Sequence, residues 1–261
     1  KARPPDGVDY ENNFYTSTNH YWLTWGNGVG LRYADESVYP AQAPSTVQIP
    51  YSFNHTLIIE NNQAFERLGY TNTHSQWDSF DHYFFHPAIN GNASESFLIN
   101  IPNPTGNGEY IVKTMLQGVT NSSRRVNLLL NQRVLGSIEW SGSTAQQFET
   151  NSISNQEIFD GQNQLNLSVS VLDGLYDRVC LNWLEITYDR EYTALNDRLF
   201  FKRDGNYSTV SQFTIDGFSS PDIVIFKKGQ TRLKNFVTDE INDSWRIILQ
   251  DQIVGLSPEY H

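Results

Sequence analysis

The feature that most constrains this sequence is a strict alternation of apolar and polar side chains between residues 165 and 171. Leu165, Leu167, Val169 and Val171 alternate with Asn166, Ser168 and Ser170. Successive side chains of a β-strand point to opposite faces, so this segment predicts a strand with one face in a core and the other in water. Helical periodicity is nearly absent, and only residues 62–68 are compatible with two helical turns. The sequence therefore predicts an all-β protein.

Hairpin signals surround this strand. The strand-like runs 126–130 and 134–140 are separated by the polar pair Asn131-Gln132, which predicts a hairpin. Asp160-Gly161 and Asp173-Gly174 mark turns on either side of the 165–171 strand. Many short strands at hairpin spacing are typical of sandwiches and jelly rolls. We therefore predict a jelly-roll β-sandwich over residues 51–190.

The two ends of the chain differ from this middle part. Residues 1–50 contain the strongly hydrophobic run 21–25 (Tyr-Trp-Leu-Thr-Trp). Residues 191–261 contain apolar runs too few and too short to form an independent core. We expect an N-terminal β-hairpin segment in residues 1–50 to pack with residues 191–261, which would form a smaller, discontinuous β-domain.

Charge and composition exclude several classes of partner. The chain has 18 Lys and Arg residues against 29 Asp and Glu residues, a net charge of −11. Nucleic acids and anionic membrane surfaces attract clustered basic residues, so neither is an expected partner. No run approaches the ~18 apolar residues of a membrane-spanning helix, so membrane insertion is not expected. Aromatic residues make up 13% and charged residues only 18%, which is typical of extracellular or cell-surface β-proteins.

The chain begins at Lys1 without a signal peptide. We interpret it as a piece of a longer, processed protein whose other domains would be its partners.

No recognisable catalytic group stands out in the sequence. Cys180 lies in the strand-like run 178–183 and is interpreted as a buried small hydrophobe. A nucleophilic role would need an exposed electropositive niche and a partner histidine. Paired carboxylates, drawn from Glu139, Asp173, Asp177 and Glu185, leave a cryptic hydrolase open as a minor alternative. We predict that the isolated chain is not an enzyme.

Loop aromatics give a possible binding site for a glycan or a protein ligand. Trp77, Trp140 and Tyr176 lie at polar segments or strand ends, and Asp173 and Asp177 flank Tyr176. An exposed ring beside hydrogen-bonding side chains can stack on a sugar. The alternative is that these rings close the ends of the sandwich.

Calcium is the only cofactor for which the sequence offers candidates. Jelly rolls can hold Ca²⁺ with loop carboxylates, and Asp78 with Asp81, or Asp173 with Asp177, could serve. The alternative is that these acids are solvated turn residues.

Several motifs, taken in order, resemble a known family. Residues 19–26 (Asn-His-Tyr-Trp-Leu-Thr-Trp-Gly), residues 81–85 (Asp-His-Tyr-Phe-Phe) and the strand 181–188 followed by Arg190 are similar to segments upstream of the catalytic domain in gingipain-like cysteine peptidases. That group includes the type IX secretion sortases. One departure is Tyr83, which stands where the family pattern has Trp.

The resemblance implies a non-catalytic β-rich region of a secreted, multidomain, peptidase-related protein. Its sandwich resembles galactose-binding-like jelly rolls. The catalytic His and Cys of such peptidases belong to a downstream domain, so no residue here inherits a catalytic role. The resemblance favours an accessory region that positions the catalytic domain or docks a substrate or partner. A carbohydrate-binding module that uses the loop aromatics is the alternative.

Overall fold

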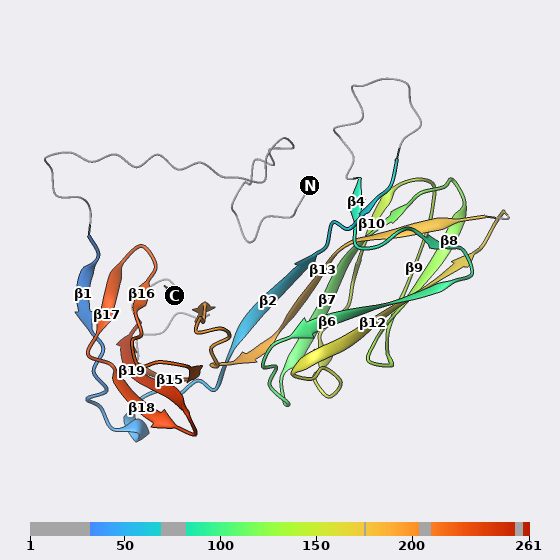
Figure 1. Cartoon of the computed structure of the whole chain (residues 1–261). Helices are drawn as coiled ribbons and strands as arrows, with labels where there is room; N and C mark the ends of the chain where they lie inside the picture. Colours follow the sequence, from blue (N-terminus) through green and yellow to red (C-terminus); the bar gives the residue numbers. More distant parts are fainter. Residues whose placement is uncertain (1–31, 69–81, 175, 204–209, 254–257) are drawn as a thin grey trace, which may run out of the picture.

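The computed structural model describes residues 32–68, 82–174, 176–203, 210–253 and 258–261. These residues form two β-rich lobes that lie next to each other along the length of the molecule (Figure 1). The described part of the chain contains no α-helix, and its one helical element is the short 3₁₀ turn η1 (Pro44–Thr46). The fold is therefore all-β, as the sequence predicts. Residues 62–68 are the exception to the expected pattern, because a short strand replaces the two helical turns.

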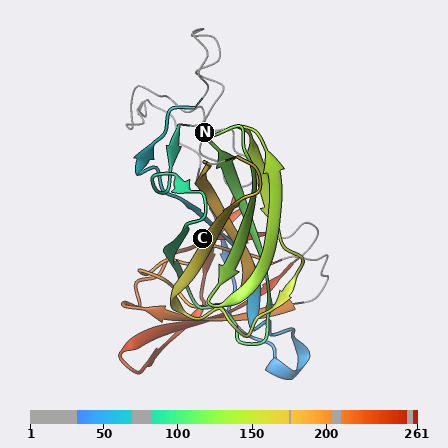
Figure 2. The ribbon, with the colours of Figure 1, turned by 90° about the vertical axis from the view of Figure 1, so that its right-hand side faces the viewer.

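The larger lobe is a jelly-roll sandwich of two packed sheets (Figure 2). Its first sheet has the order β10-β7-β13-β2, with β11 attached to β7 and β5 attached to β13. Its strands are β2 (Ser52–Glu60), β5 (Ile89–Asn90), β7 (Glu109–Gly118), β10 (Ala145–Glu149), β11 (Ile153–Ser154) and β13 (Arg178–Glu191).

The second sheet has the order β6-β12-β8-β9. Its strands are β6 (Ser94–Ile101), β8 (Ser123–Leu130), β9 (Arg133–Ser141) and β12 (Gly161–Val171). The predicted hairpin is confirmed as β8 and β9, with Leu130 opposite Arg133 across the turn at Asn131 and Gln132. Both turn residues have positive φ angles, of 47° and 73°, as a tight hairpin turn requires. A separate two-stranded ribbon joins β3 (Ala64–Phe65) to β4 (Tyr83–Phe84).

The alternation on β12 sets the core of the sandwich. Leu165 and Leu167 are fully buried, whereas Ser168 on the opposite face bonds to Ser94 at 2.6 Å on the surface. The inner sides of β7, β8 and β13 complete one continuous core, which includes Leu116, Leu128 and Ile186.

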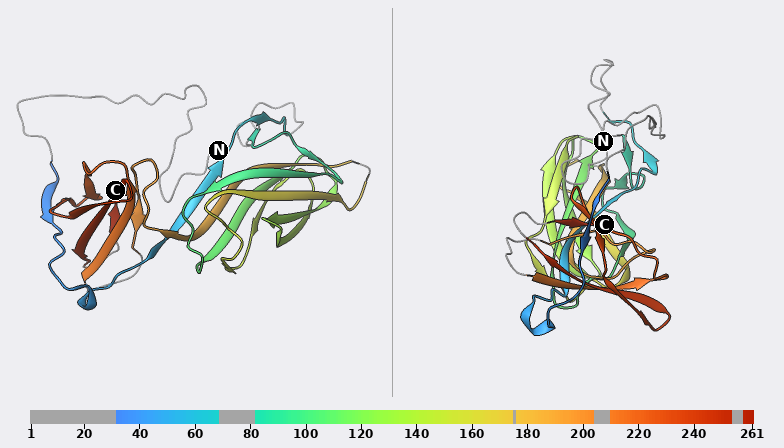
Figure 3. Two further views of the ribbon diagram at one scale, coloured as in Figure 1. Left: turned by 60° about the horizontal axis from the view of Figure 1, so that its bottom comes forward. Right: turned by 90° about the vertical axis from the view of Figure 1, so that its left-hand side faces the viewer.

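The smaller lobe contains a five-stranded and a three-stranded sheet (Figure 3). The larger of these has the order β1-β17-β16-β20-β14 and the smaller has the order β15-β19-β18. Their strands are β1 (Ala34–Ser37), β14 (Phe201–Lys202), β15 (Val210–Phe218), β16 (Ile225–Lys227), β17 (Thr231–Lys234), β18 (Val237–Ile241), β19 (Ser244–Gln252) and β20 (Glu259–Tyr260).

The smaller lobe contains residues that precede the sandwich in the sequence and residues that follow it. Strand β1 runs parallel to β17, and Val38 is buried in the same core as Phe213 and Leu249. Residues 1–31, which include the predicted Trp22 strand, lie outside the described residues. The division of the chain into residues 51–190 and a discontinuous domain of 1–50 with 191–261 stays a prediction.

The lobes are joined through the ends of β2 and β13. Phe53 of β2 belongs to the core of the smaller lobe, where its ring lies 5.1 Å from that of Tyr192. The Arg190 guanidinium at the end of β13 lies over the Phe53 ring at 5.9 Å. Two paired strands of the sandwich therefore reach directly into the second lobe.

Replacing Leu167 tests the assignment of the two faces of β12. Leu167→Ala removes a fully buried side chain, and the resulting cavity is expected to lower the free energy of unfolding by about 2–5 kcal/mol. The matched change Ser170→Ala, on the other face of the strand, removes no side-chain hydrogen bond to the described residues and is expected to alter it by less than about 0.5 kcal/mol. Urea unfolding of both variants measures the difference, and equal effects would contradict the assignment.

Candidate functional site

Several of the residues predicted to bind a ligand lie near one another at one end of the sandwich. Asp173, Tyr176 and Asp177 lie between β12 and β13, and Trp140 lies near the end of β9. Asp173 and Asp177 both contact the segment around Arg124 at the start of β8. Trp77, Asp78 and Asp81 lie outside the described residues.

Arg124 and Asp177 form a fully buried ion pair at this end. Arg124 Nε lies 2.8 Å from Asp177 Oδ2, and both side chains are 0% exposed. Arg124 Nη2 donates to the carbonyl oxygens of Thr120 and Ser122 at 2.7 and 2.6 Å. Asp177 accepts hydrogen bonds from the Thr120 hydroxyl and from the Arg178 amide. The Asp177 carboxylate is therefore bound by groups inside the protein.

The same pair fixes the position of the Trp140 ring. The guanidinium of Arg124 lies 4.9 Å from the ring centroid, a cation–π contact, and Trp140 Nε1 donates to the Thr144 carbonyl at 3.2 Å. Only 9% of Trp140 is exposed. The ring therefore packs into the end of the sandwich.

Asp173 is also held by the protein, and Tyr176 is exposed. Asp173 accepts hydrogen bonds from the backbone amide and the hydroxyl of Ser123, and the hydroxyl bond lowers the pKa of its carboxyl group. Tyr176 is 57% exposed, and its backbone carbonyl accepts a hydrogen bond from the Ser122 hydroxyl. Of this group, Tyr176 offers the most accessible aromatic surface. A ligand-binding role for these residues stays a prediction.

Cys180 is confirmed as a buried side chain. It is 1% exposed, and burial raises the pKa of its thiol to about 12. The nucleophilic form of cysteine is the thiolate, which is scarce at neutral pH for such a group. Cys180 is therefore unsuited to covalent catalysis.

Within residues 32–68, 82–174, 176–203, 210–253 and 258–261, no three His, Cys, Asp or Glu side chains are grouped so as to hold a metal ion. The calcium candidates Asp78 and Asp81 are not among these residues, so that prediction stays open. No helix in the described part of the chain is long and apolar enough to cross a membrane.

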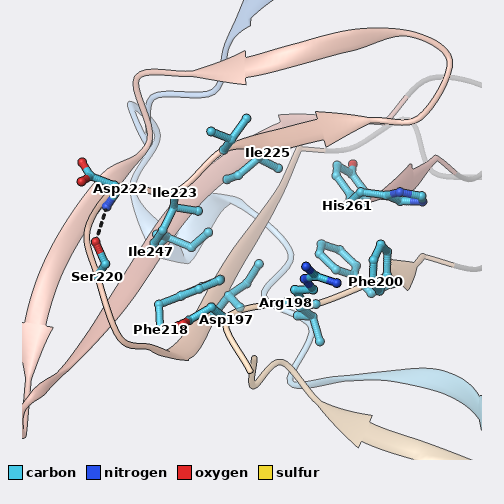
Figure 4. A pocket seen from close by; sticks show the side chains of 15 residues that line it. Asp197, Arg198, Phe200, Phe218, Ser220, Asp222, Ile223, Ile225, Ile247 and His261 are labelled. Carbon is cyan, nitrogen blue, oxygen red and sulfur yellow. Dashed lines mark hydrogen bonds between the residues drawn. The ribbon is translucent and has the colours of Figure 1, made fainter. Parts of the chain in front are cut away.

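A pocket in the smaller lobe is a feature that the sequence did not reveal. It has a volume of about 310 Å³ and opens between the turn at 197–200 and the segment leading to β16 (Figure 4). Its apolar lining includes Leu199, Phe201, Ile215, Phe218, Ile223, Val224, Ile225, Ile247 and Tyr260. In the sequence these apolar residues cannot be distinguished from residues of a filled core. The pocket between them is visible only in the three-dimensional structure.

Polar groups lie at the rim of this apolar pocket. Asp197 accepts hydrogen bonds from the amide and the hydroxyl of Ser219, at 2.6 and 2.7 Å, and these bonds lower the pKa of its carboxyl group. The Ser220 hydroxyl accepts from the Asp222 amide at 3.1 Å (Figure 4). Phe200 and Val224 are about half exposed, at 53% and 50%. The pocket therefore combines an apolar interior with exposed apolar side chains at its opening.

Comparison with known proteins gives a fold and no family. Neither a protein-family model nor a curated relative matches the sequence. The crystal structure of dimeric latent PorU from Porphyromonas gingivalis matches over 88% of this chain, at a TM-score of 0.56 and 11% sequence identity. The matched region is 22% of that PorU chain, so the present chain spans about a fifth of its length. At this identity the match shows a shared fold.

Carbohydrate-binding modules match about half of the chain, with lower TM-scores. A CBM36-1 domain of a multidomain xylanase, from the hindgut metagenome of Trinervitermes trinervoides, covers 51% of this chain and 96% of its own length, at 17% identity and a TM-score of 0.33. A CBM36 module in complex with calcium and xylotriose covers 50% of this chain and 98% of its own length, at 17% identity and a TM-score of 0.31. These similarities are too low to support an argument about function.

The buried ion pair predicts a large difference between two acid-to-amide changes. Asp177→Asn leaves the Arg124 charge buried without its counter-charge, and is expected to lower the free energy of unfolding by about 3–5 kcal/mol. The control Glu139→Gln breaks the exposed pair with Arg125 and is expected to cost less than about 1 kcal/mol. Chemical denaturation compares the two, and a small effect of Asp177→Asn would show that the pair is not structural.

Proposed function

We propose that this chain is a non-catalytic accessory region of a larger, secreted, peptidase-related protein, and that its smaller lobe docks a polypeptide segment. The docked segment belongs to another domain of the parent chain or to a protein partner. The single observation that carries this proposal is the open apolar pocket of about 310 Å³ in the smaller lobe. The fold shared with a region of PorU supports the idea of a larger parent.

The lining of the pocket favours a polypeptide side chain as the occupant. Aliphatic side chains from β15, β16 and β19 converge there, among them Ile215, Ile225 and Ile247. A pocket of this size and polarity suits one or two apolar side chains, and exposed apolar surface next to polar groups is typical of protein interaction sites. Sugar rings bind best with hydrogen-bonding groups around them, whereas ten of the fifteen lining residues of this pocket are aliphatic or aromatic.

The burial of Cys180 and Asp177 supports a non-catalytic role. The one cysteine of the chain is buried and protonated. Asp177, a candidate acid for a hydrolase, forms a buried ion pair with Arg124 inside the protein. An accessory role explains why these groups are used to stabilise the fold.

Carbohydrate binding at the other end of the sandwich is the second candidate. The observation that favours it is the exposed ring of Tyr176, in a loop whose backbone carbonyl at Tyr176 accepts a hydrogen bond from the Ser122 hydroxyl. A ring in such a position can stack on a sugar. Trp140 is too buried to share this role without a rearrangement.

A charge placed at the mouth of the pocket tests the docking proposal. Val224→Asp is expected to abolish selection of peptides from a random display library, because a carboxylate would replace a half-exposed apolar side chain at the opening. The matched control is Val134→Asp, a change at a 65% exposed valine on β9, and it is expected to leave the selection unchanged. Both variants should unfold within about 0.5 kcal/mol of the unmodified chain.

Two results would contradict the docking proposal. One is that no peptide is enriched by the unmodified chain. The other is that the chain binds glycans on an array and loses this binding in Tyr176→Ala, which would favour the second candidate.

A further inference from the structure

A second pocket lies at the junction of the two lobes. It has a volume of about 410 Å³ and is lined by His55 of β2, Arg190 of β13 and, from the segment between β13 and β14, Leu195, Asn196, Arg198 and Phe200. Arg198 and Phe200 also line the apolar pocket of the smaller lobe. The two pockets are therefore neighbours, and two residues belong to both.

Arg190 is a buried cation with few partners. It is 6% exposed, and its one side-chain hydrogen bond to the described residues runs from Nη2 to the Thr193 carbonyl at 3.0 Å. Its Nε has no hydrogen-bond partner, and no carboxylate of the described residues forms an ion pair with it. Arg124 and Arg178, by contrast, are paired with Asp177 and Glu66.

An unpaired buried charge is unfavourable, because it loses hydration without gaining a counter-charge. Asp160 acts on Arg190 at longer range, and one of its oxygens accepts a hydrogen bond from the Asn103 amide at 2.7 Å. Arg190 lines the junction cavity and is 6% exposed there, so the cavity leaves room for an anion from outside the described structure. A bound oxyanion would supply the missing counter-charge.

Arg198 brings a second guanidinium to the same pocket. It is exposed and forms no ion pair with the described residues. His55 adds no positive charge at neutral pH, because burial, and then the nearby Arg190, lower its pKa to about 4. The junction pocket thus holds two cations that form no ion pair with the described residues, in a chain whose net charge is −11.

We propose that this junction pocket binds a carboxylate of a polypeptide segment through Arg190 and Arg198, while a neighbouring apolar side chain of that segment enters the apolar pocket. This inference rests on the proposed docking function and names the chemistry of the docked segment. Guanidinium groups match carboxylates in shape and charge. The shared lining residues favour a ligand that places an acid next to an aliphatic side chain, as a peptide does.

The test uses two capped synthetic peptides and isothermal titration calorimetry on the full chain. One peptide has two isoleucines followed by a glutamate, and the other has a glutamine in place of the glutamate. The glutamate peptide is expected to bind about ten-fold more tightly, because only its side chain is charged. Arg198→Gln should remove this preference. Arg198 is exposed, so the variant is expected to fold.

Arg232→Gln is the matched control. Arg232 lies on β17 outside both pockets and also lacks an ion pair with the described residues. This variant should keep the ten-fold preference.

Three results would overturn the inference. If both peptides bind equally and Val224→Asp abolishes both, docking is supported but the carboxylate site is wrong. If neither peptide binds, both proposals fail. If oligogalacturonate binds and is lost in Arg198→Gln while the peptides do not bind, the pocket serves an acidic glycan.

Discussion

Strand β13 is the element on which both lobes depend. It is paired along one side with β7, with a β-bulge between Leu181 and Trp183, and along the other with β2 from Trp183 to Glu191. Residues from Val179 to Ile186 along it are buried without interruption. The Arg124–Asp177 pair lies at its beginning, and Arg190 lies at its end, where the second lobe begins. Strand β13 therefore runs from the end of the sandwich that holds the Arg124–Asp177 pair to the junction between the lobes.

The buried arginines at the two ends of β13, Arg124 and Arg190, differ in their partners. At the first end, Arg124 meets a carboxylate, two carbonyls and an aromatic ring, so its charge is compensated inside the protein. At the junction, Arg190 contacts a carbonyl and the Phe53 ring, and no carboxylate of the described residues forms an ion pair with it. Because a protein gains nothing in stability from an uncompensated buried cation, this contrast points to a ligand at the junction. The junction lies beside the apolar pocket, where the docked segment is proposed to bind.

The fold was largely predictable from sequence, whereas the candidate site was not. Period-two alternation at 165–171 depends only on which face of a strand is buried, so it predicts β12 directly. The 62–68 segment contains too few residues to distinguish helix from strand, and pairing with β4 decides it. The burial of Trp140 depends on Arg124, which is 16 residues away in the hairpin partner, and no local pattern encodes that contact. Pockets formed by residues from several strands are equally invisible in a linear pattern.

We propose that a partner binds at the smaller lobe and the junction rather than at the loop end of the sandwich. Mapping of backbone amide chemical shifts by nuclear magnetic resonance, during titration with the glutamate peptide, tests this most directly. We expect the changes to cluster within residues 195–201 and 218–225, the two segments that supply most of the lining of the two pockets. Changes that cluster instead around Ser122, Asp173 and Tyr176 would contradict it.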